Sequence, residues 1–531
     1  MSTPTQSSHM GPKSSTHPIE TWEVRKPAVV GARGVVASQN IDAALAGASV
    51  LEAGGNAMDA AVATALALTV AEPWMSGLGG GGYAIVREGK TGQVKIVDFG
   101  MIAAKGLDPA DYPVDAGREA EDWFGFPAVV GDVNQHGYGS IAVPGSCAGY
   151  ALLSETYGKK SWAELLEPAR KMARTGHRVT WWSTVQVTAD GAWLREYPGS
   201  KAVWLPNGLP PAASDQGPTY LDMGALADTL DRLAEAGPRD YYEGEIAKRI
   251  LSDLGKGGSK ISAEDLTSYR AEIIDPIERK RGQATYHLVP GYSAGPTYAA
   301  ALGGLPDSFG EESPGPKTYA AYAQTLVESY RRRFETMGHA GDIGDRSCTT
   351  NLSTLDNDGN MVVMTTTLLS RFGSRVVLPE TGMLMNNGIN WFDPRPGRPN
   401  SIKGGVKPLS NMSPVMVTRD GAAWFGFGAS GGRKIMPAVF QLASFVADFG
   451  MDLEQALLQP RIETSQVDKL LADDRLSAEV FAALRAMAPT DAVEATAYPA
   501  RYAIPNGVMM TEAGPTGAAH PFGPLNAAVG V

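Results

Sequence analysis

The sequence reads Ser347-Cys348-Thr349-Thr350-Asn351 about two-thirds of the way along its 531 residues, directly before a predicted β-hairpin. That hairpin pairs residues 350–355 with residues 361–368 across an Asp-Asn-Asp-Gly turn, and Asp-Gly is a strong turn signal. Two threonines at a strand start are, taken alone, simply favourable for a β-strand. The same position also suits a chain that is cut between Cys348 and Thr349.

A cut at this junction would create a nucleophile. A threonine hydroxyl needs a nearby base, and the α-amine of an N-terminal threonine, with a pKa of about 8, can be that base. A glycine-rich cluster, Gly428-Ala429-Ser430-Gly431-Gly432, follows about 80 residues downstream. Together the two stretches predict a threonine nucleophile that is exposed only when a precursor matures.

The composition excludes several classes of protein. Hydrophobic residues make up 43% of the chain and charged residues 19%, which is ordinary for a globular protein with a real core. The formal net charge of −11 argues against a nucleic-acid binder, which would present a basic face. The two cysteines, Cys147 and Cys348, and the seven histidines show no metal-ligand spacing, so we expect neither a metal nor a cofactor.

The chain shows no sign of a membrane segment. No apolar run approaches the roughly 18 residues that a transmembrane helix needs. The first twenty residues are rich in Ser, Thr, His and Pro and lack the apolar core of a signal peptide. We therefore expect residues 1–24 to form a disordered tail, and the protein to be cytoplasmic.

The glycine run at residues 77–82 matches a dinucleotide-binding fingerprint on paper, as Gly77-x-Gly79-x-x-Gly82. A dinucleotide site requires the order strand, glycines, helix, so that a phosphate meets a helix N-terminus. Here the order is helix, glycines, strand. We instead expect a turn in the core where backbone segments approach each other closely.

Periodicity and turn residues predict the remaining elements. We expect two Ala-rich helices over residues 41–51 and 57–70, and a mostly helical region from 161 to 270 with a Pro-rich loop at 205–218. Further helices are expected at 317–337 and 435–449, and hairpins at 83–87 with 94–99 and at 415–418 with 423–428.

A set of short motifs recurs in this order and spacing in one known family. The motifs are Glu52-Ala53-Gly54-Gly55-Asn56-Ala57-Met58-Asp59-Ala60-Ala61, the Gly77–Gly82 run, Val143-Pro144-Gly145, Thr349-Thr350, Asp356-x-Asp358-Gly359-Asn360, Phe372-Gly373-Ser374, Asn386-Asn387, Pro408-Leu409-Ser410-Asn411-Met412-Ser413-Pro414 and Gly431-Gly432. In them the chain resembles the γ-glutamyltransferase family of N-terminal-nucleophile hydrolases, from about residue 34 to residue 523.

The resemblance implies a fold, a maturation step and roles for particular residues. The implied fold is a mixed α/β (α+β) four-layer αββα sandwich. Autocatalytic cleavage between Cys348 and Thr349 would yield a large subunit, residues 25–348 after the tail, and a small subunit, residues 349–531, interlocked in one body. A dimer of such heterodimers is a further expectation.

On the same match, Thr349 is the nucleophile and Thr367 is hydrogen-bonded to its hydroxyl. Gly431 and Gly432 supply the backbone N–H groups of the oxyanion hole, where glycine lets the backbone approach the developing charge. Ser410 and Asn411 stand where the family has a substrate-binding serine pair.

The residues that hold a γ-glutamyl group in the family are missing. The arginine that grips the α-carboxylate is replaced by Gly100, and three polar anchors fall on Leu369, Gly388 and Trp391. Since a site stripped of its anchors loses its hold on that donor, a γ-glutamyl substrate is not the first expectation. Asn351 also stands where relatives often carry histidine.

Two arginines follow Thr367 closely and are candidates for a new anchor. We weigh Arg371 equally as a carboxylate-binding residue and as a solvated charge, and we expect Arg375 to be a solvated loop charge. The segment between Phe392 and Pro408 is shorter than in relatives with a lid over the site, and this comparison implies an open pocket that favours hydrolysis over transfer to an amine.

The resulting prediction is an amide hydrolase that forms an acyl-enzyme on a small-molecule amide. A small carboxylated amide of the oxamate kind is the leading substrate class, followed by a bulkier acyl group against Trp391 and Leu369. One alternative is a γ-glutamyl hydrolase or transpeptidase with relocated anchors. Another is a non-catalytic relative that acts as a binding protein.

Overall fold

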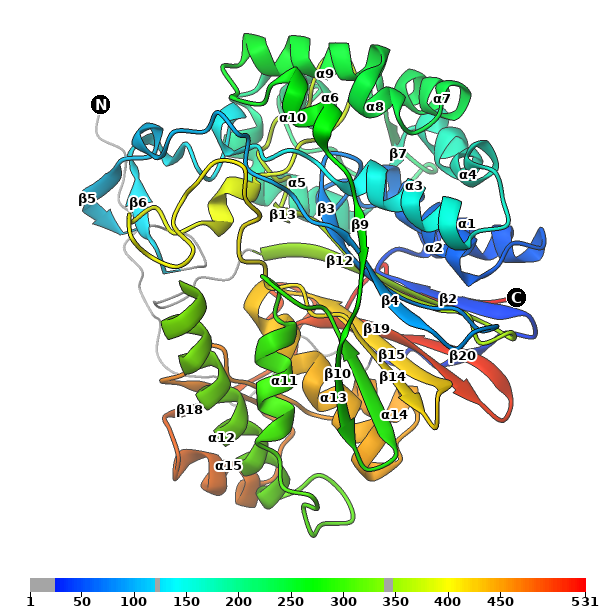
Figure 1. Cartoon of the computed structure of the whole chain (residues 1–531), viewed down its shortest axis with the longest axis vertical. Helices are drawn as coiled ribbons and strands as arrows, with labels where there is room; N and C mark the ends of the chain where they lie inside the picture. The colour runs from blue at the N-terminus through cyan, green and yellow to red at the C-terminus, as the bar shows by residue number, and fades with distance from the viewer. Residues whose placement is uncertain (1–23, 120–124, 339–346) are drawn as a thin grey trace.

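The computed structural model describes residues 24–119, 125–338 and 347–531, and these form four layers in the order helices, sheet, sheet, helices (Figure 1). The predicted disordered tail, residues 1–24, lies outside the described residues except for residue 24. The predicted αββα sandwich is confirmed, since two seven-stranded antiparallel sheets lie between two helical layers.

The first sheet contains the Thr-Thr stretch. Its strand order is β21 (Ala527–Gly530), β2 (Gly34–Ser38), β12 (Ser347–Asp356), β13 (Met361–Ser370), β3 (Gly81–Arg87), β4 (Val94–Phe99) and β9 (Glu272–Ile274). β12 is therefore a central strand, paired with β2 on one side and β13 on the other.

The second sheet contains the Gly431–Gly432 turn at the end of one of its strands. Its order is β1 (Val29–Val30), β20 (Gly514–Ala519), β19 (Ile504–Thr511), β15 (Ala422–Ser430), β14 (Val415–Arg419), β11 (Ala284–Leu288) and β10 (Ile277–Arg281). Smaller sheets are formed by β5 (Val114–Glu119) with β6 (Pro127–Val129), β7 (His177–Arg178) with β8 (Tyr220–Leu221), and β16 (Ile462–Glu463), β17 (Leu470–Asp473) and β18 (Thr490–Val493).

Helices cover the outer face of each sheet. Those on the side of the first sheet are α1 (Ile41–Glu52), α2 (Ala57–Ala71), α3 (Ser146–Tyr157), α4 (Trp162–Thr175), α5 (Trp181–Leu194), α6 (Pro198–Trp204), α7 (Leu226–Ala236), α8 (Asp240–Glu243), α9 (Glu245–Lys256) and α10 (Ala263–Ser268). Those on the other side are α11 (Gly295–Gly303), α12 (Pro316–Arg333), α13 (Ile435–Phe449), α14 (Leu453–Leu458) and α15 (Ala478–Arg485).

Side chains along the central strands alternate between two cores, as the two-residue period of a strand requires. Val362 and Met364 of β13 point outward and pack with α2, whereas Val363 between them packs in the space between the sheets. That inner space also holds Met416 of β14 and Val508 of β19, from the opposite sheet. Residues on the inner face of β12 and β13 are thus the ones that both sheets can reach.

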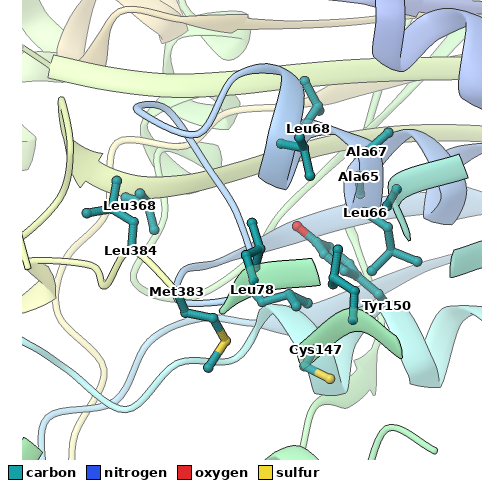
Figure 2. Packing of buried hydrophobic residues seen from close by; sticks show 14 of the residues in the cluster. Ala65, Leu66, Ala67, Leu68, Leu78, Cys147, Tyr150, Leu368, Met383 and Leu384 are labelled. Atoms are coloured by element: carbon teal, nitrogen blue, oxygen red, sulfur yellow. The ribbon is translucent and has the colours of Figure 1, made fainter. Parts of the chain in front are cut away.

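Helix α2 is buried along its whole length. Its small alanine side chains let α1, α4 and the first sheet approach it closely, and Figure 2 shows α2 residues in the resulting apolar cluster with Leu78, Tyr150 and Leu368. The helix begins at a capping box, in which the Asn56 side chain accepts from the Asp59 amide at 3.0 Å and the Asp59 carboxylate accepts from the Asn56 amide at 2.9 Å.

The glycine run follows α2 and has the expected structural role. A Cβ at Gly79 would lie 2.2 Å from the Leu384 carbonyl oxygen, and one at Gly80 would lie 2.3 Å from the Thr367 carbonyl oxygen. The prediction of a close backbone approach is therefore confirmed. The run brings β3 against β13, the strand that carries Thr367.

The predicted hairpins and the helix at 435–449 are confirmed, with two differences near the Thr-Thr stretch. The helix expected to reach residue 337 ends as α12 at Arg333 and continues as a single π-helical turn, Phe334–Gly338. β12 begins at Ser347, so Thr349 is its third residue and not its first. In an uncut chain the backbone simply continues the ladder through Cys348.

Both predicted subunits contribute strands to both sheets. In the first sheet, β2, β3, β4 and β9 come from residues before the Cys348–Thr349 junction, and β13 and β21 come from residues after it. The second sheet is mixed in the same way. No helix in the described part of the chain is both long enough and apolar enough to span a membrane.

Candidate active site

Thr349 lies at an irregularity in the β12–β13 ladder. Cys348 pairs with Leu369 and Thr350 pairs with Thr366, so two residues of β13 face Thr349 alone. The Thr349 hydroxyl is 3.3 Å from the Thr367 hydroxyl, as the family resemblance implies. Thr367 also accepts a hydrogen bond of 2.8 Å from the Leu369 amide. Both threonines are buried, and their hydroxyls lie where a bulge interrupts the ladder.

The backbone beyond Thr367 is strained. Leu369, Phe372 and Arg375 all have positive φ values, of 83°, 59° and 62°. Such conformations cost of order 1–3 kcal/mol for residues with a Cβ, and they gather at functional sites. The strained segment begins directly opposite the Cys348–Thr349 junction.

Asn351, which stands where relatives often carry histidine, links the two sheets. Its carbonyl oxygen accepts a hydrogen bond of 2.7 Å from the Asn506 side chain on β19. Its side-chain oxygen is 3.0 Å from the Thr365 hydroxyl, and a Cβ on Gly428 of β15 would collide with it. The amide side chain of Asn351, two residues after the predicted nucleophile, therefore fills the space between the two sheets.

Thr350 lies in a buried polar chain that joins three parts of the fold. Its hydroxyl is 2.7 Å from a carboxyl oxygen of Glu72, at the end of α2, and 3.1 Å from the side-chain oxygen of Gln39. The Gln39 amide nitrogen in turn donates to the Ser430 hydroxyl at 2.7 Å. Since Ser430 precedes Gly431, this chain ties the strand of the predicted nucleophile to the predicted oxyanion turn.

Burial favours the neutral form of Glu72. Its carboxyl oxygen accepts the 2.7 Å hydrogen bond from the Thr350 hydroxyl, which also lies 3.1 Å from the Gln39 oxygen. Burial raises the pKa of Glu72 to about 8, although the hydrogen bond from Thr350 opposes the shift. The sequence offered a sign that Glu72 is buried, since this acidic residue directly follows the apolar stretch that forms α2.

The raised pKa predicts a pH-dependent stability that Glu72→Gln removes. Between the ordinary pKa of 4.5 and about 8, the folded state keeps a proton that the unfolded state has lost. Stability therefore falls as the pH rises from 4.5 to about 8 and levels off above that. Because glutamine is uncharged at every pH and its oxygen can accept the Thr350 hydrogen bond, the Tm of Glu72→Gln should fall less steeply over this range.

Thermal unfolding of both proteins from pH 5 to pH 9 measures this difference, and all other titrating groups cancel in the comparison. Glu72→Ala serves as the control, since it also cannot titrate but loses the hydrogen bond at every pH. Parallel Tm profiles for wild type and Glu72→Gln would show that Glu72 is ionised in the folded state.

Gly431 and Gly432 form the turn that follows β15. Their φ values are 131° and 57°, in the region that favours glycine, and a Cβ on Gly431 would lie 2.9 Å from the Cα of Ala503. The helical turn Gly432–Lys434 contacts β12, the strand of Thr349. The structure thus brings the predicted nucleophile strand and the predicted oxyanion glycines together.

Ser410 and Asn411 are buried at 2% and 4% exposure, and their polar atoms are incompletely paired. Asn411 Nδ2 and the nearby Ser413 Oγ have no hydrogen-bond partner among the described residues, whereas the Ser410 side chain is hydrogen-bonded to Tyr83. Leaving such a group unpaired costs about 1–3 kcal/mol, so the two unpaired groups mark a place where a ligand could bind. Arg333 holds this segment from behind, with Nη2 2.7 Å from the Ser410 carbonyl oxygen.

Lys407 occupies the space beside Gly100, where the family arginine is missing. A Cβ on Gly100 would be 3.5 Å from Lys407 Cδ and 3.4 Å from the Tyr83 hydroxyl. Lys407 Nζ is 2.8 Å from Asp98 Oδ2, and its side chain keeps 27% of its surface exposed. Lys407, from a different segment of the chain, therefore places a positive charge beside the position where the family has its arginine. The signal was available, since Lys407 directly precedes the Pro408–Pro414 motif.

The other replaced anchors lie in or beside an apolar wall. Leu369 and Trp391 are 2% and 5% exposed and pack with Met101 in the core between the sheets. Gly388 follows Asn387, and a Cβ there would lie 2.8 Å from Ala142. The side chains of Leu369 and Trp391 have no acceptor atom for an ammonium group.

Arg371 and Arg375 converge on one carboxylate of α5. Arg371 Nε donates to Asp190, and Arg375 Nη2 lies 3.1 Å from Asp190 Oδ1. Arg375 is 8% exposed, so the prediction that it is a solvated loop charge is wrong. The carboxylate lies 185 residues earlier in the chain, where spacing could not point to it. That Arg371 binds the substrate stays a prediction. In the structure its guanidinium group is paired with Asp190.

The described residues offer no metal site. No group of three or more His, Cys, Asp or Glu side chains comes together there.

Comparisons with known proteins cover nearly the whole chain. A family model described as gamma-glutamyltranspeptidase matches residues 43–344 and 333–529. The glutathione hydrolase proenzyme of Escherichia coli (strain K12) is 30% identical over 510 residues, covering 86% of this chain and 85% of that protein. The acylase ACY 1 proenzyme of Pseudomonas sp. (strain V22) is 31% identical over 485 residues, covering 83% and 84%.

A solved structure shows the same fold. The crystal structure of cephalosporin acylase from Bacillus halodurans matches with a TM-score of 0.83 at 24% identity, and the match covers 98% of this chain and 99% of that one.

Proposed function

The chain belongs to the gamma-glutamyltranspeptidase family of enzymes, and from this premise we propose that it is a self-cleaving amide hydrolase with Thr349 as its nucleophile. The observation that carries the proposal is the pair of buried hydroxyls, Thr349 and Thr367, 3.3 Å apart at the bulge of a central strand. The names of the two relatives, a glutathione hydrolase and an acylase, each a proenzyme, support amide chemistry and processing.

Maturation would begin with Thr349 itself. Its Oγ attacks the carbonyl carbon of Cys348, the C–N bond breaks, and the nitrogen of Thr349 keeps the proton that the hydroxyl lost. Water then hydrolyses the resulting ester, which leaves a carboxylate on Cys348 and a free α-amine on Thr349. The products are the fragments 1–348 and 349–531, held together because each contributes strands to both sheets.

The catalytic cycle uses the same groups. The α-amine of Thr349 takes the hydroxyl proton as Oγ attacks the amide carbon of the substrate, and the N–H groups of Gly431 and Gly432 stabilise the oxyanion. The amine returns the proton to the leaving nitrogen, and the acyl group stays on Oγ as an ester. Water, activated by the same amine, releases the acid and restores the enzyme.

The position of Lys407 sets the length of the acyl group that we propose. Gly81 of β3 pairs with Thr367 and lies against residues 99–101 at the end of β4, so Gly100 is two strands from Thr367 and three from β12, the strand of Thr349. Three inter-strand spacings amount to about 14 Å. An oxamate carboxylate, directly bonded to the amide carbon, is too short to span this distance. We propose a longer acyl chain, of about five carbons, that ends in a carboxylate.

The apolar wall argues against the γ-glutamyl alternative. A γ-glutamyl group and a glutaryl group have the same length and differ by one α-ammonium group. Beside Leu369 and Trp391 that ammonium would lose its hydration without gaining a partner, which is costly. We therefore propose a dicarboxylic-acid monoamide as the substrate class, with Lys407 and the unpaired Asn411 amide nitrogen as its carboxylate partners.

Three anilides test the substrate class, because they differ only in the acyl group. Glutaryl anilide should be hydrolysed with a kcat/KM at least tenfold above that of γ-glutamyl anilide, and pentanoyl anilide should be poor because it lacks the carboxylate. A γ-glutamyl anilide that equals or exceeds glutaryl anilide would favour the family's usual donor. Faster turnover of oxamate than of glutaryl anilide would restore the short substrate.

Lys407→Met tests the anchor in the same assay. Its expected effect is a rise of about tenfold in KM for glutaryl anilide, as for loss of a charged hydrogen bond, with little change in kcat. Pentanoyl anilide is the matched control, because its hydrolysis does not use the anchor. An equal loss on both substrates would show that Lys407 acts only through its contact with Asp98.

A further inference from the structure

A polar pocket lies next to the Ser410–Asn411 segment. Arg333 lines this pocket and also donates to the Ser410 carbonyl oxygen. The pocket is enclosed by α11, α12 and the edge strand β10, which lie side by side in Figure 1. Its volume is ≈ 410 Å³, large enough for a small molecule. Its polar lining consists of Arg279, Thr297, Ser329, Arg332, Arg333 and Thr336.

The pocket has three guanidinium groups and no acidic side chain in its lining. In the described part of the chain, none of Arg279, Arg332 and Arg333 lies within 4 Å of a carboxylate oxygen. Neighbouring arginines do find such partners, as Arg331 does with Asp468 at 3.6 Å and Arg281 with Asp448 at 2.9 Å. Three cations that share one pocket repel each other unless an anion enters.

Arg333 is the deepest of the three, at 2% exposure. Its hydrogen-bond partners in the described part of the chain are neutral, namely the carbonyl oxygens of Ser293 and Ser410, the Thr297 hydroxyl, the Asn411 side-chain oxygen and the Met337 sulfur. Its Nε has no partner among the described residues. Burial lowers the pKa of Arg333 to about 10, which expresses the cost of a buried cation without a counter-charge.

We propose that this pocket binds a small multivalent oxyanion, either a phosphate-bearing or a multiply carboxylated molecule. Arg279 and Arg332 are exposed and reach the anion from β10 and α12, the fork-shaped guanidinium being suited to both oxyanion types. The hydroxyls of Thr297, Ser329 and Thr336 add neutral donors. Thr297 also belongs to the first turn of α11, where the helix dipole favours a negative charge.

The occupant is a small molecule and not a polymer. The protein carries a net charge of −11, so the positive pocket is a local exception on an acidic protein that repels a long polyanion. A short anion enters without bringing further charge against that surface.

Arg333 connects this pocket to the active site. The same guanidinium that lines the pocket holds Ser410 and Asn411, so a bound anion shifts the position or the hydrogen bonds of that segment. This consequence rests on the proposed function, whereas binding itself does not. Binding of an anion in this pocket should change the KM for glutaryl anilide by a measurable factor. It should not change the extent of cleavage between Cys348 and Thr349.

Calorimetric titration tests the binding, with inorganic pyrophosphate and citrate as the two probes at constant ionic strength. We expect at least one probe to bind with a Kd below about 1 mM, and Arg279→Gln and Arg332→Gln each to weaken it about tenfold. Arg331→Gln is the matched control, one residue away on the same helix and outside the pocket. The probe that binds decides between a phosphate and a carboxylate ligand.

Two results would overturn the proposal. One is no heat of binding from either probe, and the other is an equal loss of affinity in Arg331→Gln and Arg332→Gln, as expected of non-specific attraction. The three arginines that are replaced, Arg279, Arg331 and Arg332, are exposed, so the variants should fold. Equal Tm values would verify this. Because the titration also works with the uncut Thr349→Ala chain, a failure of the proposed function leaves it interpretable. An unchanged KM with bound probe would overturn the link through Arg333 alone.

Discussion

A Thr349→Ala chain is expected to remain one 531-residue polypeptide without amide hydrolase activity, whereas the wild type separates into two fragments. Alanine has no hydroxyl to attack the Cys348 carbonyl, so neither the cut nor the acyl-enzyme can form. Removing a nucleophile of this kind costs about 10⁵–10⁶-fold in kcat. Intact mass spectrometry and N-terminal sequencing measure the cut, with residue 349 as the new first residue of the smaller fragment.

Thr349→Ser is the matched control for this experiment. Serine keeps the hydroxyl, so the variant should still be cut and retain part of the activity. Cleavage before residue 349 in the alanine variant would remove the assignment of the nucleophile. A wild-type chain that stays whole and hydrolyses none of the anilides would instead favour the non-catalytic binding protein.

The second large effect is expected from Gly431→Ala, with kcat lowered about 100-fold per cleaved molecule. The added Cβ meets the Cα of Ala503 at 2.9 Å, and a φ of 131° is strained for alanine. The turn must therefore shift, and its N–H groups move from the position of the oxyanion. Losing one such donor typically costs about 10²–10³ in kcat.

Gly421→Ala separates this catalytic effect from simple backbone strain. Gly421 also has a positive φ, of 79°, but a Cβ there meets nothing within 4 Å. Gly421→Ala should lose roughly 1 kcal/mol of stability and keep its activity, whereas Gly431→Ala, whose added Cβ also meets Ala503, should lose more stability and its activity as well. Steady-state kinetics and Tm values measure both. An equal fall in kcat in the two variants would remove Gly431 from the oxyanion site.

Much of the fold could be predicted because it depends on local patterns. The Asp-Gly turns between residues 350 and 368 and between 415 and 428 set the hairpins, and helical periodicity set α13 at residues 435–449. The start of β12 was missed by three residues, at Ser347 instead of residue 350, because an uncut chain continues the ladder where the mature chain would begin. The π-helical turn after Arg333 has no sequence signal that spacing rules detect.

The sequence by itself determined the chemistry that we propose for this protein. The Thr349–Thr350 pair before a hairpin, Thr367 on the partner strand and the Gly431-Gly432 turn all lie in backbone features that neighbouring residues specify. Hydrogen-bonded ladders and positive φ values are local requirements, and the residue types that satisfy them can be recognised in one dimension.

Only the tertiary structure decided which charges surround that chemistry. It placed Lys407 beside Gly100, Asp190 between Arg371 and Arg375, the buried Glu72 beside Thr350, and Arg333 behind Ser410. Each of these pairs joins segments from 77 to more than 300 residues apart. The burial of these side chains and their electrostatic partners follow from how the layers pack. The spacing of residues along the chain does not indicate that packing.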